Sequence, residues 1–548
     1  MRTILLALVF LVTAGAQPQA ILQDLEDRAL GALSSLPRAG SWAEADKQRA
    51  PLRRKLERSL GFDRASAAAA APALLYVPKK LDGRAPAVIV VSAHEDPKSA
   101  DAQVFADSLA RLGFLVFQLD VRLHHVRLDL LQNGVTPQGL MQRDIRSALA
   151  YLVSRGDVDP KRIGLAGTGL AVTVAAAVNE QFSAIAVTDG GPDFREQLRS
   201  MRALSGKDLP DTCALIPGLL RYAATEELLA LIAPRPILAI QSAPSVAEYA
   251  TDLYRSFGAA GKLRQLPETG SAREIRLASY RWFARWLQER SELSSFAETD
   301  TAAIQPVEVQ LPAAPPATPV TKEPVTLHAL SALLGDALPQ GNIGYGLQVA
   351  PVQNTTLNTQ RGVETPVTVY RPGPEGGNFD DGFLIALDDD GKAALSNDPV
   401  IREALRRNWT VWAVDPRGIG DMKTESESFL FAASLLLGEN LVWRQAADLE
   451  RITGGLGFRN VHHRLGIYAN GKTAALAATY LAAVAARDVP SWIVLRNSVS
   501  SLSNTGDVPL YVPAFDALSM FDIPDLLAAA KPKIYVITQP DEFINAEW

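Results

Sequence analysis

Two short stretches of this sequence have the form of a catalytic turn but carry glycine where the reactive side chain belongs. In Gly167-Thr168-Gly169-Leu170-Ala171, a strand, a sharp turn of small residues and a helix follow one another, as in the G-x-S-x-G turn that presents a nucleophilic serine. Gly169 stands at the serine position, and Gly471 stands there in Ala469-Asn470-Gly471-Lys472-Thr473. Glycine has no oxygen or sulfur to attack a carbonyl, so covalent catalysis is excluded at both turns.

The second turn also matches the phosphate-binding pattern G-x-x-x-x-G-K-[ST], from Gly466 to Thr473. In a nucleotide-binding loop, backbone N–H groups would cradle the phosphates and Lys472 would contact them. Ile467 and Tyr468, however, belong to the apolar run that predicts a strand, so the remaining loop is too short to wrap a phosphate. We therefore expect no nucleotide partner.

The cysteine and histidine content gives little support for metal or disulfide chemistry. The single cysteine, Cys213, excludes an intramolecular disulfide and a cysteine-based zinc site. The histidines are His94, His124, His125, His328, His462 and His463. Adjacent histidines on one segment point apart, and no carboxylate pair stands beside them at ligand spacing. We expect no metal and no cofactor.

A residual ligand site does not require a nucleophile. Oxyanion stabilisation uses backbone N–H groups, which do not depend on side-chain type, so the amide of Leu170 and one from the loop after the predicted strand Ala87–Val91 are candidates. The candidate cleft residues are His94, Glu95, Thr168, Leu170 and Asp189. Asp189 ends a predicted strand and would either face the mouth of the sheet, where open α/β folds bind ligands, or cap a helix.

The elements that must position these residues form two series in which apolar runs of strand length alternate with segments of helical period. The first series is Leu74–Val77, Ala87–Val91, Phe114–Leu119, Ile163–Ala166, Ala184–Val187 and Ile237–Ile240. The second is Val367–Tyr370, Phe383–Leu387, Thr410–Val414, Leu465–Tyr468, Trp492–Leu495 and Ile534–Ile537. Buried strands that alternate with helices predict a parallel sheet covered on both faces. The two series repeat at a near-constant offset, which indicates a duplicated domain.

The length of 548 residues also predicts more than one domain. The predicted units are a signal peptide (1–16), an N-terminal helical segment (17–65), a first domain (66–295), a Pro-rich linker (296–324) and a C-terminally incomplete second domain (325–548). The signal peptide rests on Arg2, the apolar run Ile4–Val12 and the small-residue site Ala14-Gly15-Ala16. That run is too short to span a bilayer, so we expect export and no stable membrane span.

The charge balance excludes one class of partner. The formal net charge is −6, and charged residues make up 21% of the chain. A nucleic-acid-binding protein would carry a basic stripe, and none stands out along this sequence. We expect no nucleic-acid partner.

The first half resembles the acetyl xylan esterase-like branch of the α/β-hydrolase superfamily, a secreted bacterial kind. The stretches that carry the resemblance are Leu140–Leu152, Val158–Gly164, Pro217–Tyr222 and Leu231–Leu238, within about residues 45–290. The second half is similar but more diverged. The resemblance implies a serine at the sharp turn, an aspartate after the strand Ile237–Ile240 and a histidine before the last helix.

The sequence departs from this pattern at all three positions. Gly169 replaces the serine, Gln241–Ser245 contains no acid and Pro267–Arg273 contains no histidine. In the second half Gly471 again replaces the serine, Asp541 is a candidate residual acid, and no histidine follows residue 463. We therefore predict no usable catalytic triad in either domain.

The fold class that we expect is two tandem doubly wound α/β-hydrolase domains with mostly parallel sheets and helices on both faces. Because function depends on the site and not on the fold, two readings stay open. The first is an exported bacterial pseudoenzyme that binds a carbohydrate or acyl-ester ligand in the old cleft or acts in an assembly. The alternative is an active carboxylic-ester hydrolase of the carbohydrate-deacetylase type that uses other residues.

Overall fold

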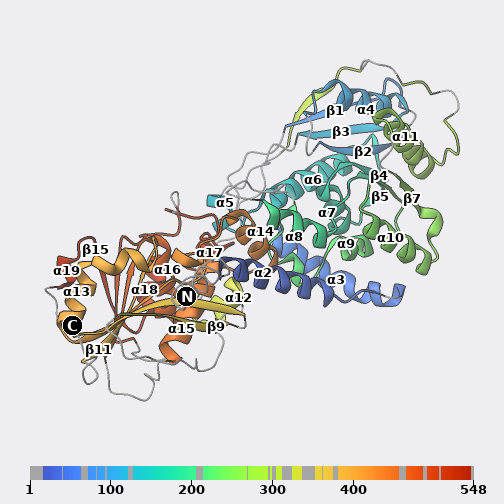
Figure 1. Cartoon of the computed structure of the whole chain (residues 1–548). Coiled ribbons are helices and arrows are strands. Elements are labelled where there is room, and N and C mark those ends of the chain that lie inside the picture. The colour runs from blue at the N-terminus through green and yellow to red at the C-terminus, as the bar shows by residue number, and fades with distance from the viewer. Residues whose placement is uncertain are drawn as a thin grey trace.

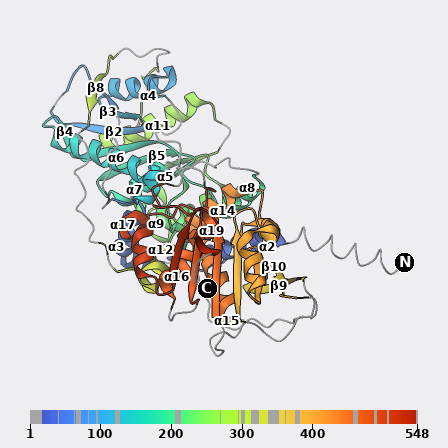
Figure 2. The same cartoon turned by 90° about the vertical axis from the view of Figure 1, so that its left-hand side faces the viewer.

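The computed structural model describes most of the chain between residues 17 and 544. The positions outside this description are 1–16, 40, 63, 65–71, 82, 93–95, 121–127, 205–213, 268–269, 294–295, 299–303, 312–321, 323, 336–351, 361, 374–380, 456–463, 486–489, 505–507 and 545–548. Figures 1 and 2 show an elongated molecule with two lobes, each built around one sheet. No described helix is long and apolar enough to cross a membrane.

Domain one is built on an eight-stranded sheet in the order β7-β6-β5-β4-β2-β3-β1-β8. The strands are β1 (Pro72–Tyr76), β2 (Ala85–Ser92), β3 (Leu115–Asp120), β4 (Val158–Thr168), β5 (Phe182–Thr188), β6 (Ile237–Ile240), β7 (Leu263–Leu266) and β8 (Val307–Gln310). All neighbours from β3 to β7 pair in parallel, whereas β1 is antiparallel to both β3 and β8. Strand β8 lies in the stretch predicted as a Pro-rich linker, and it closes one edge of the sheet.

Domain two repeats this order in a seven-stranded sheet, β15-β14-β13-β11-β12-β10-β9. Its strands are β9 (Val352–Gln360), β10 (Val363–Tyr370), β11 (Gly382–Asp388), β12 (Trp409–Val414), β13 (Arg464–Asn470), β14 (Trp492–Arg496) and β15 (Lys533–Ile537). The strands from β12 to β15 pair in parallel, and β10 is antiparallel to β9 and β12. The predicted fold class is confirmed in its architecture: two tandem doubly wound α/β units with mostly parallel sheets and helices on both faces.

Helices cover both faces of each sheet, because successive strand residues point to opposite sides. In β2, Val88 and Val90 pack with α4 and α11, whereas Ile89 and Val91 pack with α6 and α7. The helices of domain one are α4 (Ala100–Arg111), α5 (Leu128–Gln132), α6 (Pro137–Ser154), α7 (Leu170–Val178), α8 (Phe194–Ala203), α9 (Thr225–Ile232), α10 (Pro244–Ser256) and α11 (Ala272–Gln288). Those that follow are α12 (Leu327–Leu334), α13 (Pro399–Arg406), α14 (Glu427–Leu437), α15 (Leu441–Gly455), α16 (Lys472–Val484), α17 (Ala517–Met520), α18 (Ile523–Ala529) and α19 (Asp541–Ile544).

Two N-terminal helices, α2 (Gln17–Ser34) and α3 (Trp42–Ser59), precede the first sheet. Helix α2 lies between the two lobes, where it contacts α8 of domain one and α14 and β10 of domain two (Figure 1). One face of the helix is apolar, and Leu22, Leu25, Ala29 and Leu33 are buried in a hydrophobic cluster that continues through both domains. The two lobes therefore share one core in this region.

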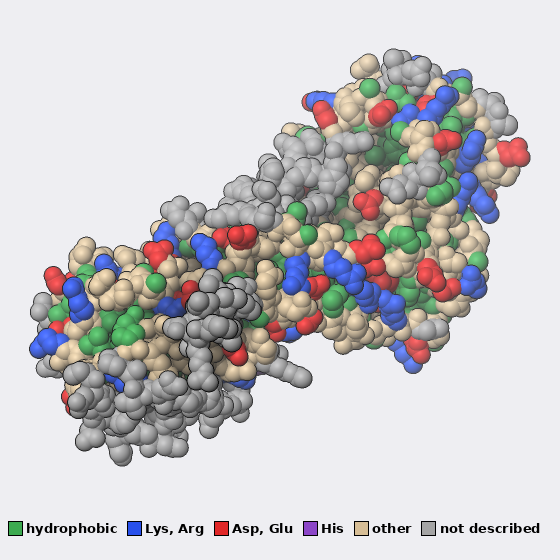
Figure 3. Space-filling view, in the orientation of Figure 1, with side chains coloured by type: hydrophobic (Ala, Val, Ile, Leu, Met, Phe, Trp, Pro, Cys, Tyr) green, Lys and Arg blue, Asp and Glu red, His purple; other side chains and the backbone are tan. Residues whose placement is uncertain are grey.

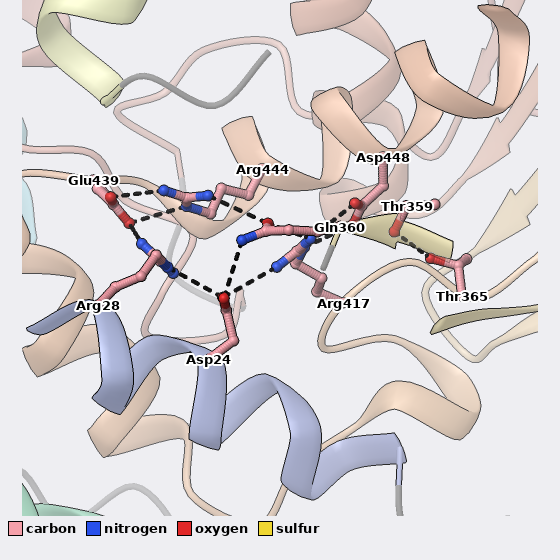
Figure 4. Close-up of polar contacts among 9 residues, drawn as sticks. All are labelled: Asp24, Arg28, Thr359, Gln360, Thr365, Arg417, Glu439, Arg444 and Asp448. Carbon is pink, nitrogen blue, oxygen red and sulfur yellow. Dashed lines mark hydrogen bonds and ion pairs between the residues drawn. The ribbon is translucent and has the colours of Figure 1, made fainter. Parts of the chain in front are cut away.

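A polar network joins the other face of α2 to domain two (Figure 4). Arg417 donates to both carboxylate oxygens of Asp448, at 2.8 and 3.0 Å, and to the Gln360 side-chain oxygen at 2.8 Å. Gln360 donates to Asp24 of α2 at 3.0 Å, and Arg28 of α2 pairs with Asp24 and Glu439. Burial alone would lower the pKa of Arg417, but the charge and hydrogen bonds of Asp448, together with the charges of Asp24 and Glu439, outweigh burial and raise it. The network fixes α2 onto domain two through paired, hydrogen-bonded charges.

A buried carboxyl in α9 gives domain one a pH-dependent stability. Glu227 is only 4% exposed, and burial raises its pKa to about 7, although the Ala224 N–H donates to it. Because the folded pKa lies above the unfolded value near 4.5, the stabilisation is present below pH 4.5 and is lost as the pH rises through 7. We expect the free energy of unfolding to fall by about 3 kcal/mol across this window. Urea titrations at several pH values will measure it, and Glu227→Gln should flatten the dependence if Glu227 is its source.

Candidate functional site

Both glycines at the nucleophile positions lie at a strand-to-helix turn with left-handed backbone. Gly169 follows β4 with φ +87° and precedes α7, and Gly471 follows β13 with φ +105° and precedes α16. The Gly169 N–H donates to Thr188 O at 2.9 Å, and the Gly471 N–H donates to Arg496 O at 2.9 Å. The two turns therefore have matching geometry, and each holds a residue without a reactive group in a conformation that favours glycine.

A cavity of about 270 Å³ lies beside the turn of domain one. It opens at the carboxyl ends of β2, β4 and β5, between α4 and the first turns of α11. Its apolar walls include Val90, Ala102, Phe105, Ala166, Ala186 and Ile275. Its polar groups are Ser92, Asp101, Thr168, Thr188, Arg276 and Ser279. Ligands of open α/β sheets bind at this end of the strands, so the cavity is the candidate functional site.

The structure brings only part of the predicted cleft to this cavity. Thr168 is exposed and lines it. Leu170 is 5% exposed and belongs to the hydrophobic core, and Asp189 is exposed at the end of β5 but is not among the lining residues. His94 and Glu95 lie outside the described residues, directly after the end of β2. The predicted role of all five residues in ligand binding stays a prediction.

The positions where the resemblance implies an acid and a base have structural contacts instead. Ser245 in the first turn of α10 donates to Asp193 at 2.6 Å, where Asp193 caps α8. Ser271 caps α11 and exchanges hydrogen bonds with Glu274. Among the described residues near the cavity there is no histidine. These contacts stabilise helix ends and place no general base beside Gly169.

The charges in the cavity wall are mutually paired. Arg276 of α11 donates to Glu298 from Nε at 2.8 Å and from Nη2 at 3.1 Å, and to Asp101 from Nη1 at 3.2 Å. Burial alone would raise the pKa of Glu298, but hydrogen bonds from Arg276 and Tyr280 outweigh it and lower the pKa. The hydrogen bonds that Arg276 donates to Glu298 raise the pKa of Arg276 in turn. The cavity therefore contains a compensated ion cluster and no free cation among its described residues.

In domain two, the side chain of Asp389 fills the space beside the turn at Gly471. Asp389, in the loop after β11, accepts hydrogen bonds from the backbone N–H groups of Thr473 (3.1 Å) and Ala474 (2.8 Å) at the start of α16. A Cβ atom on Gly471 would lie 2.3 Å from Asp389 Cγ, closer than real Cβ contacts allow. The Asp389 carboxylate thus accepts the hydrogen bonds of the backbone N–H groups that could otherwise bind an anion.

A smaller cavity, of about 130 Å³, lies next to this closed turn. Asp389, Lys423, Thr424, Thr473 and Tyr511 are among its lining residues. Asp541, the candidate residual acid, begins α19, is exposed and is not among the lining residues. Among the described residues, no group of three or more potential ligands could hold a metal ion.

Sequence reasoning missed Arg276, Asp101 and Asp389. A signal exists for Arg276, because it shares a helical face with Ala272, Ile275 and Ser279 in α11. For Asp389, the signal is the run Asp388-Asp389-Asp390, which directly follows a predicted strand in the sequence. Which of its carboxylates reaches α16 depends on how two strands lie side by side, and the sequence does not contain that information locally.

Comparisons with known proteins give a hydrolase-like resemblance. No family model matches the chain. A curated relative, described as "Putative hydrolase YtaP" from Bacillus subtilis (strain 168), is 26% identical over 254 residues, which cover 40% of this chain and 84% of the relative. The resemblance to a hydrolase is thus supported over less than half of the chain.

Solved structures similar to this chain include esterases. One is a putative acetyl xylan esterase from Bacteroides fragilis NCTC 9343, with a TM-score of 0.38, 15% identity and coverage of 43% of this chain and 80% of that one. A second is a methylesterase, with a TM-score of 0.36, 19% identity and coverage of 47% of this chain and 67% of that one. A third is a glucuronoyl esterase from Solibacter usitatus, with a TM-score of 0.32, 16% identity and coverage of 39% of this chain and 77% of that one. These values are too low to carry an activity over to this chain.

Proposed function

We propose that this chain is an exported bacterial α/β-hydrolase-fold protein without triad catalysis, which binds a small ester or carbohydrate-derived ligand in the domain-one cavity. The observation that carries the proposal is that the open domain-one cavity adjoins a turn with glycine, Gly169, at the nucleophile position. In an active serine esterase, the nucleophile, a histidine and an acid would converge on this place. Here the described surroundings offer hydroxyl groups and a paired arginine.

The proposal includes export of the protein and the limits of its domains. Residues 1–16 are the predicted signal peptide, and the small residues Ala14-Gly15-Ala16 are its predicted cleavage site. The segment 17–65 then serves as a helical connector, 66–295 and 325–548 as the two domains, and 296–324 as the connection between them. Both signs of charge occur on both lobes on the face seen in Figure 3, as is usual for a surface without a nucleic-acid partner.

The protein recovered from the periplasm of an expression host will test the proposal. We expect no covalent labelling by a fluorophosphonate probe and no turnover of p-nitrophenyl acetate at ordinary serine-esterase rates, because neither glycine can form an acyl-enzyme. Gly169→Ser is the informative variant: without a base it should stay inactive too. Stoichiometric labelling of the natural chain would instead support the active carboxylic-ester hydrolase and would identify its nucleophile.

A further inference from the structure

The inner wall of the domain-one cavity is apolar, unlike the wall of a carbohydrate-binding site. Sugar-binding sites use several polar groups with free hydrogen-bonding capacity, whereas the inner wall here is made of Val90, Ala166 and Ala186 from the sheet. All three side chains are at most 6% exposed. Phe105 of α4 and Ile275 of α11 cover the opposite side. An apolar slot of this kind gains free energy from each methylene group that leaves water.

The charged residues of the cavity do not favour an anionic ligand. Each of the three guanidinium nitrogens of Arg276 already donates to Glu298 or Asp101. The Glu298 side chain is 4% exposed and also accepts from Tyr280 at 2.7 Å. Arg273 also lies 3.8 Å from Glu298, so two cations and two carboxylates compensate one another, and the cluster leaves no unpaired positive charge to hold an ionised acid, which a neutral ester does not need.

One hydroxyl in the cavity is placed to recognise a carbonyl oxygen. Ser92 ends β2, is 9% exposed and accepts a long hydrogen bond from the Gln118 side-chain amide at 3.5 Å. Among the described residues, the Ser92 hydroxyl donates to none. A serine hydroxyl has one proton and rotates to suit its acceptor, so this proton is available to a ligand.

We propose that the cavity takes a neutral acyl ligand whose chain lies between β4, α4 and α11 and whose carbonyl accepts a hydrogen bond from Ser92. This inference rests on the proposed function and specifies its ligand class. A cavity of 150 Å³ accommodates benzene, so about 270 Å³ accommodates roughly ten carbon atoms. The ligand is thus a medium-chain ester, with the alcohol portion at the mouth beside Thr168 and Thr188.

Titration calorimetry with methyl esters from methyl butanoate to methyl dodecanoate will test the chain length, using the whole mature chain. We expect the affinity to rise about fourfold for each added methylene group and to level off near ten carbons, when the cavity is full. Sodium octanoate should bind several-fold more weakly than methyl octanoate, because its carboxylate must leave water and finds no unpaired cation in the described cavity wall. Affinity that does not change with chain length would overturn the inference.

Three variants test where the ligand binds. Ala272→Trp, at an exposed lining position in the first turn of α11, should fill the cavity and abolish methyl octanoate binding. Glu248→Trp adds the same side chain at an exposed position of α10 away from the cavity and should leave binding unchanged. Ser92→Ala should weaken methyl octanoate binding about two- to tenfold, the value of one hydrogen bond, and leave butylbenzene binding unchanged.

The outcomes separate this inference from the proposed function. If acetylated xylose binds, Ala272→Trp prevents it and esters show no dependence on chain length, the cavity is a ligand site but the acyl inference is wrong. If the esters and the acetylated sugar all fail to bind to a folded natural chain, both proposals are wrong. A graded chain-length series that Ala272→Trp abolishes and Glu248→Trp preserves supports both.

Discussion

Replacing Asp448 by alanine will lower the free energy of unfolding by about 3–5 kcal/mol, the usual cost of leaving a buried charge without its partner. The Arg417 side chain is 2% exposed and the Asp448 side chain is 2% exposed, so water cannot replace the lost carboxylate. Asp24 of α2 lies 3.6 Å from Arg417 and offsets only part of the loss. Because Arg417 also donates to Gln360, the contact between α2 and domain two weakens at the same time.

Urea denaturation followed by tryptophan fluorescence will measure this effect, and the double variant Arg417→Met/Asp448→Leu is its control. The double variant removes both charges and keeps the volume, so it should recover most of the stability. A single variant as stable as the natural chain would show that Arg417 is solvated in solution. Asp27→Ala, which changes an exposed carboxylate of α2 outside the network, should have little effect.

Gly471→Ser will destabilise domain two by about 2–5 kcal/mol and will not create an esterase. Two costs combine: a side chain at φ +105° is strained, and its Cβ would lie 2.3 Å from Asp389 Cγ. Asp389 must move before a serine fits, and its hydrogen bonds to Thr473 and Ala474 are then lost. The same urea titration gives the size of the loss.

A double-mutant cycle with Asp389→Gly separates the two costs. Asp389→Gly alone removes a helix cap, but in the Gly471→Ser background it also removes the clash, so the double variant should be more stable than the sum of the single effects predicts. Strict additivity would mean that Asp389 does not occupy the turn. This geometry also explains why the proposed ligand binds domain one, where the cavity beside Gly169 stays open.

The sequence was sufficient to predict the buried strands of both sheets, from β1 to β6 and from β10 to β15, and the two turns that carry glycine. Val88–Val91 and Ile467–Ala469 are continuous apolar runs, which report burial on both faces of a sheet whatever their neighbours are. Gly169 and Gly471 are recognisable because a strand-to-helix turn has a strict local pattern of small residues. Strands β7, β8 and β9 were not predicted, since each lies at the edge of a sheet and has no continuous apolar run.

What the sequence by itself determined is therefore local: two series of alternating strands and helices, and a strand-to-helix turn with glycine in each of them. Only the tertiary structure decided that the first turn borders an open cavity and that the second is closed by Asp389. It likewise decided that Asp24, Gln360, Arg417 and Asp448, far apart in the chain, form one buried network. The physical reason is that backbone period and turn geometry depend on neighbouring residues, whereas the pairing of buried charges and the filling of space depend on which elements the fold packs together.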